Sequence, residues 1–308
     1  MHALVFSALV AMTLGPVLPL SLSAVGASPS PINPAGKTIP KAATAVDRGA
    51  SAAAGDRMFV YKTVGGQPLR LWVRSPPGVK PGDRRPAAVF FHGGGWVSGP
   101  LFQFTAHCTH LAARGMVAVQ VEYRFAPKGD LGGPPTVCIQ DARSAMRWVR
   151  SHARELGIDP TRIAAGGGSA GGHLAAFASM VDGCDDPGDD LEVSPRGNAQ
   201  LLFNPVLDNG PGGYAHDRMG ENWLNYSPAH HVSADDPPAI VFLGTKDALV
   251  PVKTLATFAK EMANRGVRCE ERYYPDREHG FFNKSPDREA TIAECDAFLV
   301  SLGWLPAI

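Results

Sequence analysis

The chain has 308 residues and carries 29 Lys plus Arg against 29 Asp plus Glu. Its hydrophobic fraction of 44% is ordinary for a soluble globular protein, and its length allows one large domain or two small ones. Because the formal net charge is zero, we expect neither nucleic acid nor an anionic membrane surface to be a partner.

The amino-terminal residues have the pattern of a secretory signal. An apolar stretch with two prolines ends in Val25-Gly26-Ala27, small residues that suit a signal peptidase. We therefore predict a signal peptide at 1–27, a secreted or periplasmic protein and no stable membrane association. No lysine or arginine precedes the apolar stretch, and a membrane anchor is the alternative. Residues 28–57, rich in Ala, Pro, Ser and Gly, are predicted to be a mobile leader.

From residue 58 onward the chain alternates strand-like and helix-like segments. Two strands at 58–64 and 69–74 flank a Gly-Gly-Gln-Pro turn and predict an antiparallel edge. The later apolar runs lie at 87–91, 116–123, 162–165, 199–207, 239–243 and 268–274, and the helical segments at 102–114, 136–156, 173–180, 252–265 and 288–302. This alternation predicts an α/β domain over 58–308, with a mostly parallel sheet, helices on both faces and reactive loops at the carboxyl ends of the strands.

Two glycine-rich segments follow buried strands. The first, His92-Gly93-Gly94-Gly95-Trp96, is a loop of bare backbone that can aim amide hydrogens at an oxyanion. The second, Gly166–Gly172, joins a strand to a helix and contains Gly-x-Ser-x-Gly, which is typical of an elbow that holds a nucleophilic serine. We therefore predict that Ser169 is a nucleophile.

The second segment also fits the dinucleotide-binding fingerprint Gly-x-Gly-x-x-Gly. That fingerprint belongs at the first strand of its unit, with an acidic residue ending the next strand about 20 residues on. Here at least two strands precede the glycines, and the following strand at 199–207 comes too late. The elbow interpretation is therefore favoured.

An insertion at 208–237 leaves the sheet after a strand end and carries large apolar side chains, among them Trp223 and Tyr226. Loops of this length are usually functional or poorly ordered. Two interpretations stay open: a flap over the site, or a surface loop whose aromatic side chains pack on its own underside.

A serine hydroxyl needs a base to take its proton and an acid to orient that base. His279 directly follows the last predicted strand and is the predicted base, whereas His173 is disfavoured because an elbow serine points away from the helix that it opens. Asp247, just past the strand at 239–243, is the predicted acid. The alternative acids, which also lie in strand-end loops, are Asp276 and Asp208.

The histidines and cysteines predict no metal site. His92 and His230-His231 lack a His-x-x-x-His partner or a nearby cluster of carboxylates, and the five cysteines contain no Cys-x-x-Cys pair. The odd number leaves at least one thiol unpaired in a monomer, and the pairing of the others stays open.

The chain resembles the hormone-sensitive-lipase-like branch of the alpha/beta-hydrolase family from about Met58 to its end. The likeness rests on the first glycine loop, on Tyr123-Arg124-Phe125-Ala126-Pro127, which is similar to the branch's Tyr-Arg-x-Ala-Pro, and on the elbow, where the branch often has Asp and this chain has Gly168. The resemblance implies that Tyr123 and Arg124 support the site from below. It also implies three amide donors for the oxyanion, at Gly93, Gly94 and Ala170.

By this resemblance the protein is expected to be a serine carboxylic-ester hydrolase without a cofactor. Because the long helical cap of many members is missing, the chain is more similar to bacterial carbohydrate esterases that remove acetyl or feruloyl groups from plant cell-wall xylan. Trp96 and Trp223 are predicted to contact the small-molecule or polysaccharide ester. The alternatives are an aryl formamidase, a general short-chain carboxylesterase and, from another class, a binding protein on an inactive hydrolase scaffold.

Overall fold

Residues 55–128 and 132–307 are described by the structure, a computed structural model. The predicted signal peptide at 1–27 and nearly all of the predicted leader at 28–57 lie outside these residues, so both stay predictions. Within the described ranges, every helix is too short or too polar to cross a membrane.

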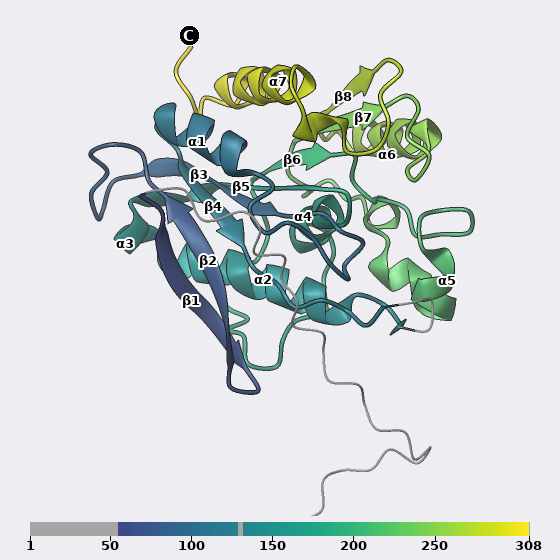
Figure 1. The fold of residues 1–308 in the computed structure, drawn as a ribbon, viewed down its shortest axis with the longest axis horizontal. Helices are drawn as coiled ribbons and strands as arrows, with labels where there is room; N and C mark the ends of the chain where they lie inside the picture. The colour runs from purple at the N-terminus through teal and green to yellow at the C-terminus, as the bar shows by residue number, and fades with distance from the viewer. Residues whose placement is uncertain (1–54, 129–131, 308) are drawn as a thin grey trace, which may run out of the picture. The chain divides into compact units, whose positions relative to one another are not determined.

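One eight-stranded sheet runs through the domain in the order β1-β2-β4-β3-β5-β6-β7-β8 (Figure 1). β1 pairs with β2 and β2 with β4 in antiparallel fashion, and the other neighbouring strands are parallel. The strands are β1 Arg57–Val64, β2 Gln67–Arg74, β3 Arg85–Phe91, β4 Val117–Val121, β5 Ile158–Gly168, β6 Ala199–Phe203, β7 Ala239–Gly244 and β8 Cys269–Tyr274. The predicted α/β class, a mostly parallel sheet with an antiparallel amino-terminal edge, is confirmed.

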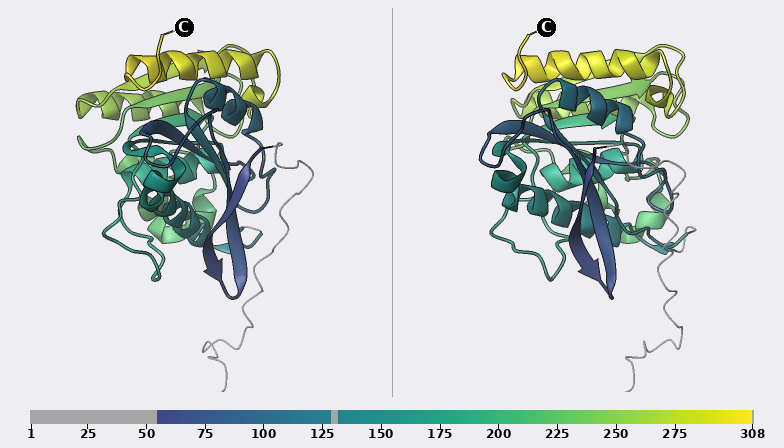
Figure 2. Two further views of the ribbon diagram at one scale, coloured as in Figure 1. Left: turned by 90° about the vertical axis from the view of Figure 1, so that its left-hand side faces the viewer. Right: turned by 60° about the vertical axis from the view of Figure 1, so that its left-hand side comes forward.

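Helices cover both faces of this sheet, with α1 and α7 on one face and α2, α4 and α6 on the other (Figures 1 and 2). Side chains of β3 alternate between the two cores: Ala88 and Phe90 join the α1 and α7 side, whereas Val89 and Phe91 join the other. The helices are α1 Thr105–Ala113, α2 Thr136–Ser151, α3 Ala153–Leu156, α4 Ala170–Met180, α5 His216–Met219, α6 Val252–Asn264 and α7 Asp287–Ser301. The central strands are therefore buried on both sides, which gives their end loops a rigid support.

Several boundaries differ from the sequence prediction, and those of α2 and β5 have clear physical reasons. The helix predicted at 136–156 is interrupted at His152, where α2 ends and the short α3 begins. β5 begins at Ile158, four residues before the predicted run, because Asp159-Pro160-Thr161 is part of the strand instead of a turn before it. A register irregularity between β3 and β5 accommodates the proline there.

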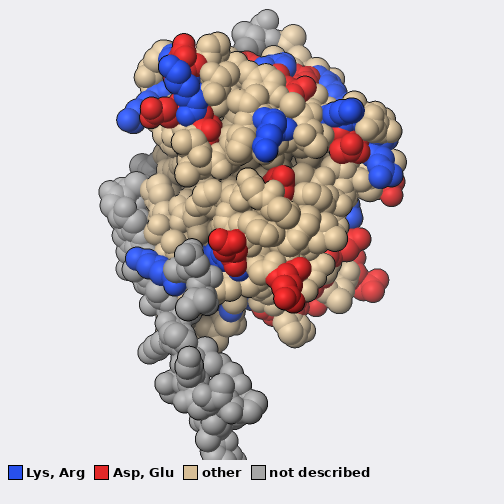
Figure 3. Space-filling view, turned by 90° about the vertical axis from the view of Figure 1, so that its right-hand side faces the viewer, with Lys and Arg blue, Asp and Glu red and all other residues tan. Residues whose placement is uncertain are grey.

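All five cysteines lie among the described residues as free thiols, and three of them are buried in the cores. The three buried ones are Cys108, Cys138 and Cys295. Figure 3 shows one face of the molecule, on which uncharged side chains cover most of the surface and charged side chains of both signs are scattered among them. This distribution matches the balanced composition of the chain.

Candidate active site

The elbow between β5 and α4 places Ser169 in a backbone conformation that side chains rarely adopt, with φ 54° and ψ −120°. The residues two positions before and two positions after it have to be glycines. A Cβ on Gly171 would lie 2.0 Å from the carbonyl oxygen of Phe91, and one on Gly167 would lie 2.4 Å from Gly171 backbone. The Ser169 amide donates to the Phe203 carbonyl at 2.9 Å, which fixes the elbow to the end of β6.

The three residues predicted to act together lie in one hydrogen-bonded line. Nε2 of His279 is 2.8 Å from Oγ of Ser169, and Nδ1 of the same ring is 2.7 Å from Oδ2 of Asp247. An ionised carboxylate only accepts hydrogen bonds, so Nδ1 carries the ring proton and Nε2 accepts from the serine hydroxyl. Segments 110 and 32 residues apart in sequence thus meet at the carboxyl ends of β5, β7 and β8.

The Asp247 carboxylate is inaccessible to solvent and is held by its own loop. Its Oδ1 accepts the amides of Leu249 at 2.8 Å and Val250 at 2.9 Å, so Oδ2 is directed at the imidazole. The alternative acids have other partners: Asp276 pairs with Lys246 at 2.9 Å on the surface, and Asp208 accepts the Gly210 amide at 2.7 Å.

Asn204 is a site residue that sequence reasoning missed. It follows β6 directly with φ 35°, its Oδ1 accepts the Gly280 amide at 2.9 Å, and its Nδ2 lies 3.5 Å from Nε2 of His279. Sequence reasoning had included Asn204 in the predicted strand at 199–207, whereas β6 ends at Phe203. The available signal was an amide side chain directly after the apolar residues 201–203.

The first glycine loop lies beside Ser169 and offers unpaired amides. Among residues 55–128 and 132–307, the amides of Gly94, Gly95 and Ala170 meet no hydrogen-bond acceptor. Gly94 has φ +124°, and a Cβ there would lie 2.0 Å from the Ser98 carbonyl oxygen. The Gly93 amide, also a predicted donor, instead donates to Oε1 of Gln103 at 2.8 Å. Two of the three predicted donors are thus free, and Gly95 is a third free amide that the sequence reading did not include.

Tyr123 supports the glycine loop from the sheet side. Its hydroxyl donates to the His92 carbonyl at 2.7 Å, and the two rings stack with centroids 4.3 Å apart. Burial lowers the pKa of His92 to about 4, so this imidazole stays neutral. Arg124 contacts Asp141 of α2 through two hydrogen bonds of 2.8 and 2.7 Å, which ties the following segment to the helix layer.

Trp96 has no solvent-exposed surface with which to contact a substrate. It is fully buried, and its indole donates to Nδ1 of His173 at 3.3 Å, while Nε2 of His173 donates to the Tyr226 carbonyl at 2.7 Å. We therefore correct the prediction for Trp96: it packs beneath the loop because its bulk fills the space between α4 and the insertion. His173 joins these two elements, on the flank of α4 where the sequence placed it.

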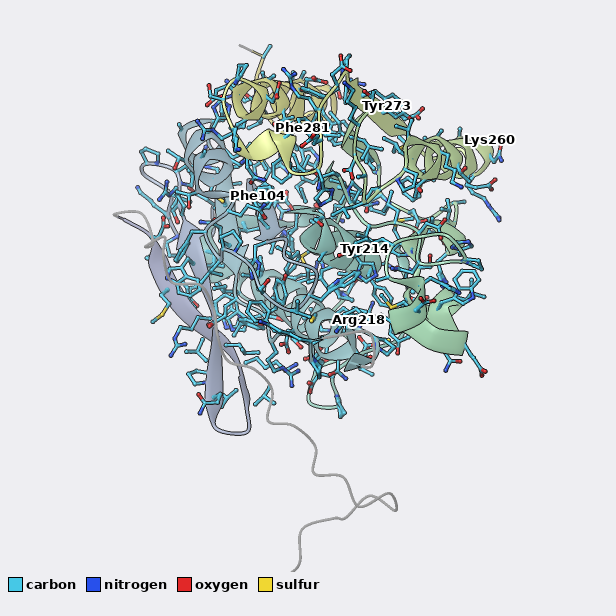
Figure 4. All side chains as sticks on the ribbon, turned by 45° about the vertical axis from the view of Figure 1, so that its right-hand side comes forward. Phe104, Tyr214, Arg218, Lys260, Tyr273 and Phe281 are labelled. Carbon is cyan, nitrogen blue, oxygen red and sulfur yellow. The ribbon has the colours of Figure 1, made fainter. Side chains whose placement is uncertain are left out.

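The insertion packs on itself and against the glycine loop. Trp223 stacks edge-on against His230 at 4.8 Å, so its ring lies within the insertion. Tyr214, labelled in Figure 4, lies 5.8 Å from the Trp96 ring and lines the cavity of Ser169. The aromatic residue of the insertion that lines this cavity is Tyr214. Trp223 does not line it, and its contact with the ester stays a prediction.

A cavity of about 250 Å³ lies over Ser169. Its polar wall contains the side-chain amides of Gln103, Asn204 and Asn283, and its apolar wall includes Tyr214 and Leu249. This volume is at the small end for ligand sites and suits a short acyl group. Within the described ranges, no group of three or more His, Cys, Asp or Glu side chains has the arrangement of a metal site.

A larger hollow of about 650 Å³ lies elsewhere, lined by residues that include Arg196 and His231. The Arg196 guanidinium is engaged by Asp182 at 3.0 Å and Asp236 at 3.4 Å, so its charge is balanced. The nucleophile and the base line the smaller cavity, and the acid is bonded to the base behind them, so we take this cavity as the candidate active site.

Comparisons with known proteins agree with the observed fold. Residues 88–223 match the family described as alpha/beta hydrolase fold, and residues 205–302 match the prolyl oligopeptidase family. The apo form of Thermogutta terrifontis esterase 2 is 42% identical, with a TM-score of 0.78 over 83% of this chain and 98% of that chain. The chain belongs to the alpha/beta-hydrolase family.

Other members of this family are similar over shorter stretches. A probable carboxylic ester hydrolase, LipM of Mycobacterium tuberculosis, is 31% identical over 63% of this chain and 48% of its own length. The carboxylesterase NlhH of the same bacterium is 38% identical over 41% of this chain and 37% of its own length. The chain thus spans about half of the first relative and less of the second. Thermogutta terrifontis esterase 2 also has solved structures with propionate and with butyrate bound.

Proposed function

We propose that this chain is a serine carboxylic-ester hydrolase. The observation that carries the proposal is the line of hydrogen bonds from Asp247 through His279 to Ser169, at 2.7 and 2.8 Å, next to unpaired backbone amides. This arrangement supplies the three needs of acyl transfer: a nucleophile, an oriented base and donors for the negative charge that develops.

The proposed reaction has two steps. Nε2 of His279 takes the proton of Ser169, whose oxygen attacks the ester carbonyl. The amides of the glycine loop and of Ala170 donate hydrogen bonds to the oxyanion as it forms. Each such donor stabilises the transition state by about 2.7 to 4 kcal/mol. The imidazolium then gives its proton to the departing alcohol, and a water activated by the same imidazole releases the acid and restores Ser169.

We propose a short acyl group, or an aromatic one, as the group removed. The small cavity supports this, and so does the binding of propionate and butyrate by a relative that is 42% and 41% identical. Turnover of p-nitrophenyl esters of increasing chain length tests it. A preference for chains longer than about ten carbons would contradict the proposal.

We further propose that the ester belongs to a plant cell-wall polysaccharide and that the enzyme acts outside the cell or in the periplasm. The sequence resemblance, the predicted signal peptide at 1–27 and the polar wall of the cavity support this choice, because side-chain amides can bond to sugar hydroxyls. Release of acetate from acetylated xylan, compared with ferulate from feruloylated arabinoxylan and with Ser169→Ala as the blank, tests it. Release of neither acid would leave a general short-chain carboxylesterase, the function that the names of the relatives favour.

Two alternatives predict other outcomes. An aryl formamidase would hydrolyse N-formylkynurenine in preference to acetyl esters. A binding protein with an inactive site would not react with a fluorophosphonate, whereas the proposed hydrolase is labelled at Ser169.

A further inference from the structure

A series of hydrogen bonds joins the glycine loop to the loop of His279. The Gly93 amide donates to Oε1 of Gln103 at 2.8 Å, and Nε2 of Gln103 donates to Oδ1 of Asn283 at 3.0 Å. Nδ2 of Asn283 donates to the Gly280 carbonyl at 2.9 Å. Gln103 and Asn283, which we call the carboxamide bridge, thus link segments 180 residues apart in sequence.

The bridge fixes one end of a peptide unit whose other end is already fixed. The carbonyl of this unit belongs to His92 and accepts the Tyr123 hydroxyl at 2.7 Å, while its N–H belongs to Gly93 and meets Gln103. The unit lies against the nucleophile, since a Cβ on Gly93 would be 3.4 Å from Cβ of Ser169. Its orientation sets the direction of the next peptide, which carries the free amide of Gly94.

Glycine backbone is the most mobile of all residues, and three glycines in a row give this loop little stiffness of its own. An oxyanion site works because its donors are already oriented before the charge appears. Side chains outside the loop therefore have to fix the orientation of its amides. The side chain of Gln103 has the position and the hydrogen-bonding groups to do so.

We propose that Gln103 is a positioning residue for the oxyanion donors. Its carboxamide holds the Gly93 peptide in place, and through Asn283 it keeps the glycine loop in register with His279. The inference rests on the ester-hydrolase function proposed above, and it adds a residue that acts through Gly93 and Gly94 without touching the substrate's carbonyl.

The opposite interpretation is that the Gln103 oxygen blocks an oxyanion donor at Gly93. The two interpretations predict opposite signs. If Gln103 positions the loop, its removal slows the reaction; if it blocks a donor, its removal exposes the Gly93 amide and speeds the reaction. The amides of Gly94, Gly95 and Ala170, left unpaired in the described part of the chain, favour positioning because the donors do not depend on Gly93.

The full-length protein with Gln103→Met tests the proposal, because methionine keeps the length of the side chain and lacks the carbonyl acceptor. With p-nitrophenyl acetate we expect kcat to fall at least about 10-fold while KM changes less than about 3-fold, the pattern of a loss confined to the transition state. Gln140→Met is the matched control: Gln140 is also half-buried, donates to the Asp185 carbonyl at 3.4 Å and lies outside the cavity. Its kinetics should stay within about 2-fold of wild type.

Gln103→Glu separates positioning from simple packing. A carboxylate still accepts the Gly93 amide, so the loop keeps its order. It cannot donate to Oδ1 of Asn283, so the hold on the Gly93 peptide is kept while the link to the loop of His279 is lost. We therefore expect kcat of Gln103→Glu to lie between those of Gln103→Met and wild type. A side chain that only filled space would give the two variants the same kcat.

Hydrogen–deuterium exchange gives a readout that does not depend on activity. The segment 92–98 should exchange at least about 3-fold faster in Gln103→Met than in wild type, because the Gly93 amide loses its acceptor. Failure of wild type to hydrolyse esters would overturn the proposed function, and this exchange would still test the bridge. Unchanged exchange, or a kcat for Gln103→Met equal to or above that of wild type, would overturn the positioning role.

Discussion

The two oxygens of the Asp247 carboxylate have different partners. Oδ1 accepts two backbone amides of its own loop, and Oδ2 accepts the proton on Nδ1 of His279. The first pair of bonds fixes the carboxylate, and the last bond fixes the tautomer of the imidazole. As a result Nε2 has a free lone pair toward Ser169, which is the state that a general base needs.

Asp247→Asn is predicted to lower kcat by about 10,000-fold with little change in folding. The new amide keeps the shape of the carboxylate, but its NH₂ donates to Nδ1 and moves the ring proton to Nε2. That nitrogen then has no lone pair for the serine proton. Steady-state kinetics with a p-nitrophenyl ester measures the loss, and circular dichroism checks the fold.

Asp276→Asn is the matched control for this prediction. Asp276 is in the loop of His279 but pairs with Lys246 on the surface, so its replacement should leave kcat within about 3-fold of wild type. A severe loss in Asp276→Asn together with a mild one in Asp247→Asn would show that the orienting acid has been assigned wrongly.

Sequence reasoning selected residues with a motif or a distinctive chain position and missed those without one. Ser169, Asp247 and His279 follow predicted strands, and the topology of a doubly wound sheet brings such ends together. Gln103 and Asn204 are single amide side chains without a motif, and their roles arise from tertiary contacts. The prediction for Trp96 was wrong because a large aromatic residue next to a site can either contact the substrate or pack in the core, and the sequence pattern is the same in both cases.

At the scale of elements, the glycine-flanked elbow sets the distance between β3, β5 and α4. Gly168 is close-packed as well, since a Cβ there would lie 2.5 Å from Cζ of Phe282. The Phe282 ring therefore occupies space that a larger residue would need. This contact gives a physical reason for the glycine before Ser169.

Gly171→Ala is predicted to reduce the free energy of unfolding by at least about 3 kcal/mol. The new Cβ would lie 2.0 Å from the Phe91 carbonyl oxygen, and backbone atoms of a central strand cannot move aside at little cost. Denaturant unfolding followed by fluorescence measures the change. Gly188→Ala is the control, since its Cβ would meet Asp186 Oδ1 at an ordinary 3.4 Å. Equal stability of the two variants would contradict the packing argument.

Sequence patterns predicted which helices and strands exist more accurately than they predicted the first and last residue of each. Apolar runs identified the buried strands because residues on both faces of β3 to β7 are apolar. The break at His152 and the early start of β5 were missed, since both depend on contacts between elements instead of local pattern. The insertion at 208–237 contains α5 and two 3₁₀ helices, and its role as a flap stays one of two interpretations.

At the scale of the whole molecule, three histidines are buried in neutral form. Burial lowers the pKa of His107 to about 3 and of His92 and His173 to about 4. In the described part of the chain, neither ring nitrogen of His107 has a hydrogen-bond partner, and the ring packs among phenylalanines that include Phe104 and Phe203. An unfolded histidine titrates near pH 6.5, so unfolding takes up protons below that pH.

The stability contributed by these histidines is complete above about pH 6.5 and is lost as the pH falls toward their folded-state values. Each should reduce the free energy of unfolding by about 2 kcal/mol between pH 7 and pH 5. Guanidinium unfolding at the two pH values measures this, with His107→Leu as the diagnostic variant because leucine does not titrate. If His107→Leu loses as much stability on acidification as wild type, His107 is not the source.

The central claim is that Ser169 becomes acylated with His279 as its base, and trapping the intermediate tests it most directly. Wild-type protein mixed with excess p-nitrophenyl acetate and quenched in acid should gain the mass of one acetyl group, located by peptide mapping at Ser169. Ser169→Ala should gain none at that position, and His279→Ala should acylate at least about 1,000-fold more slowly. Ester hydrolysis without an acyl group on Ser169, or equally fast acylation in His279→Ala, would contradict the account.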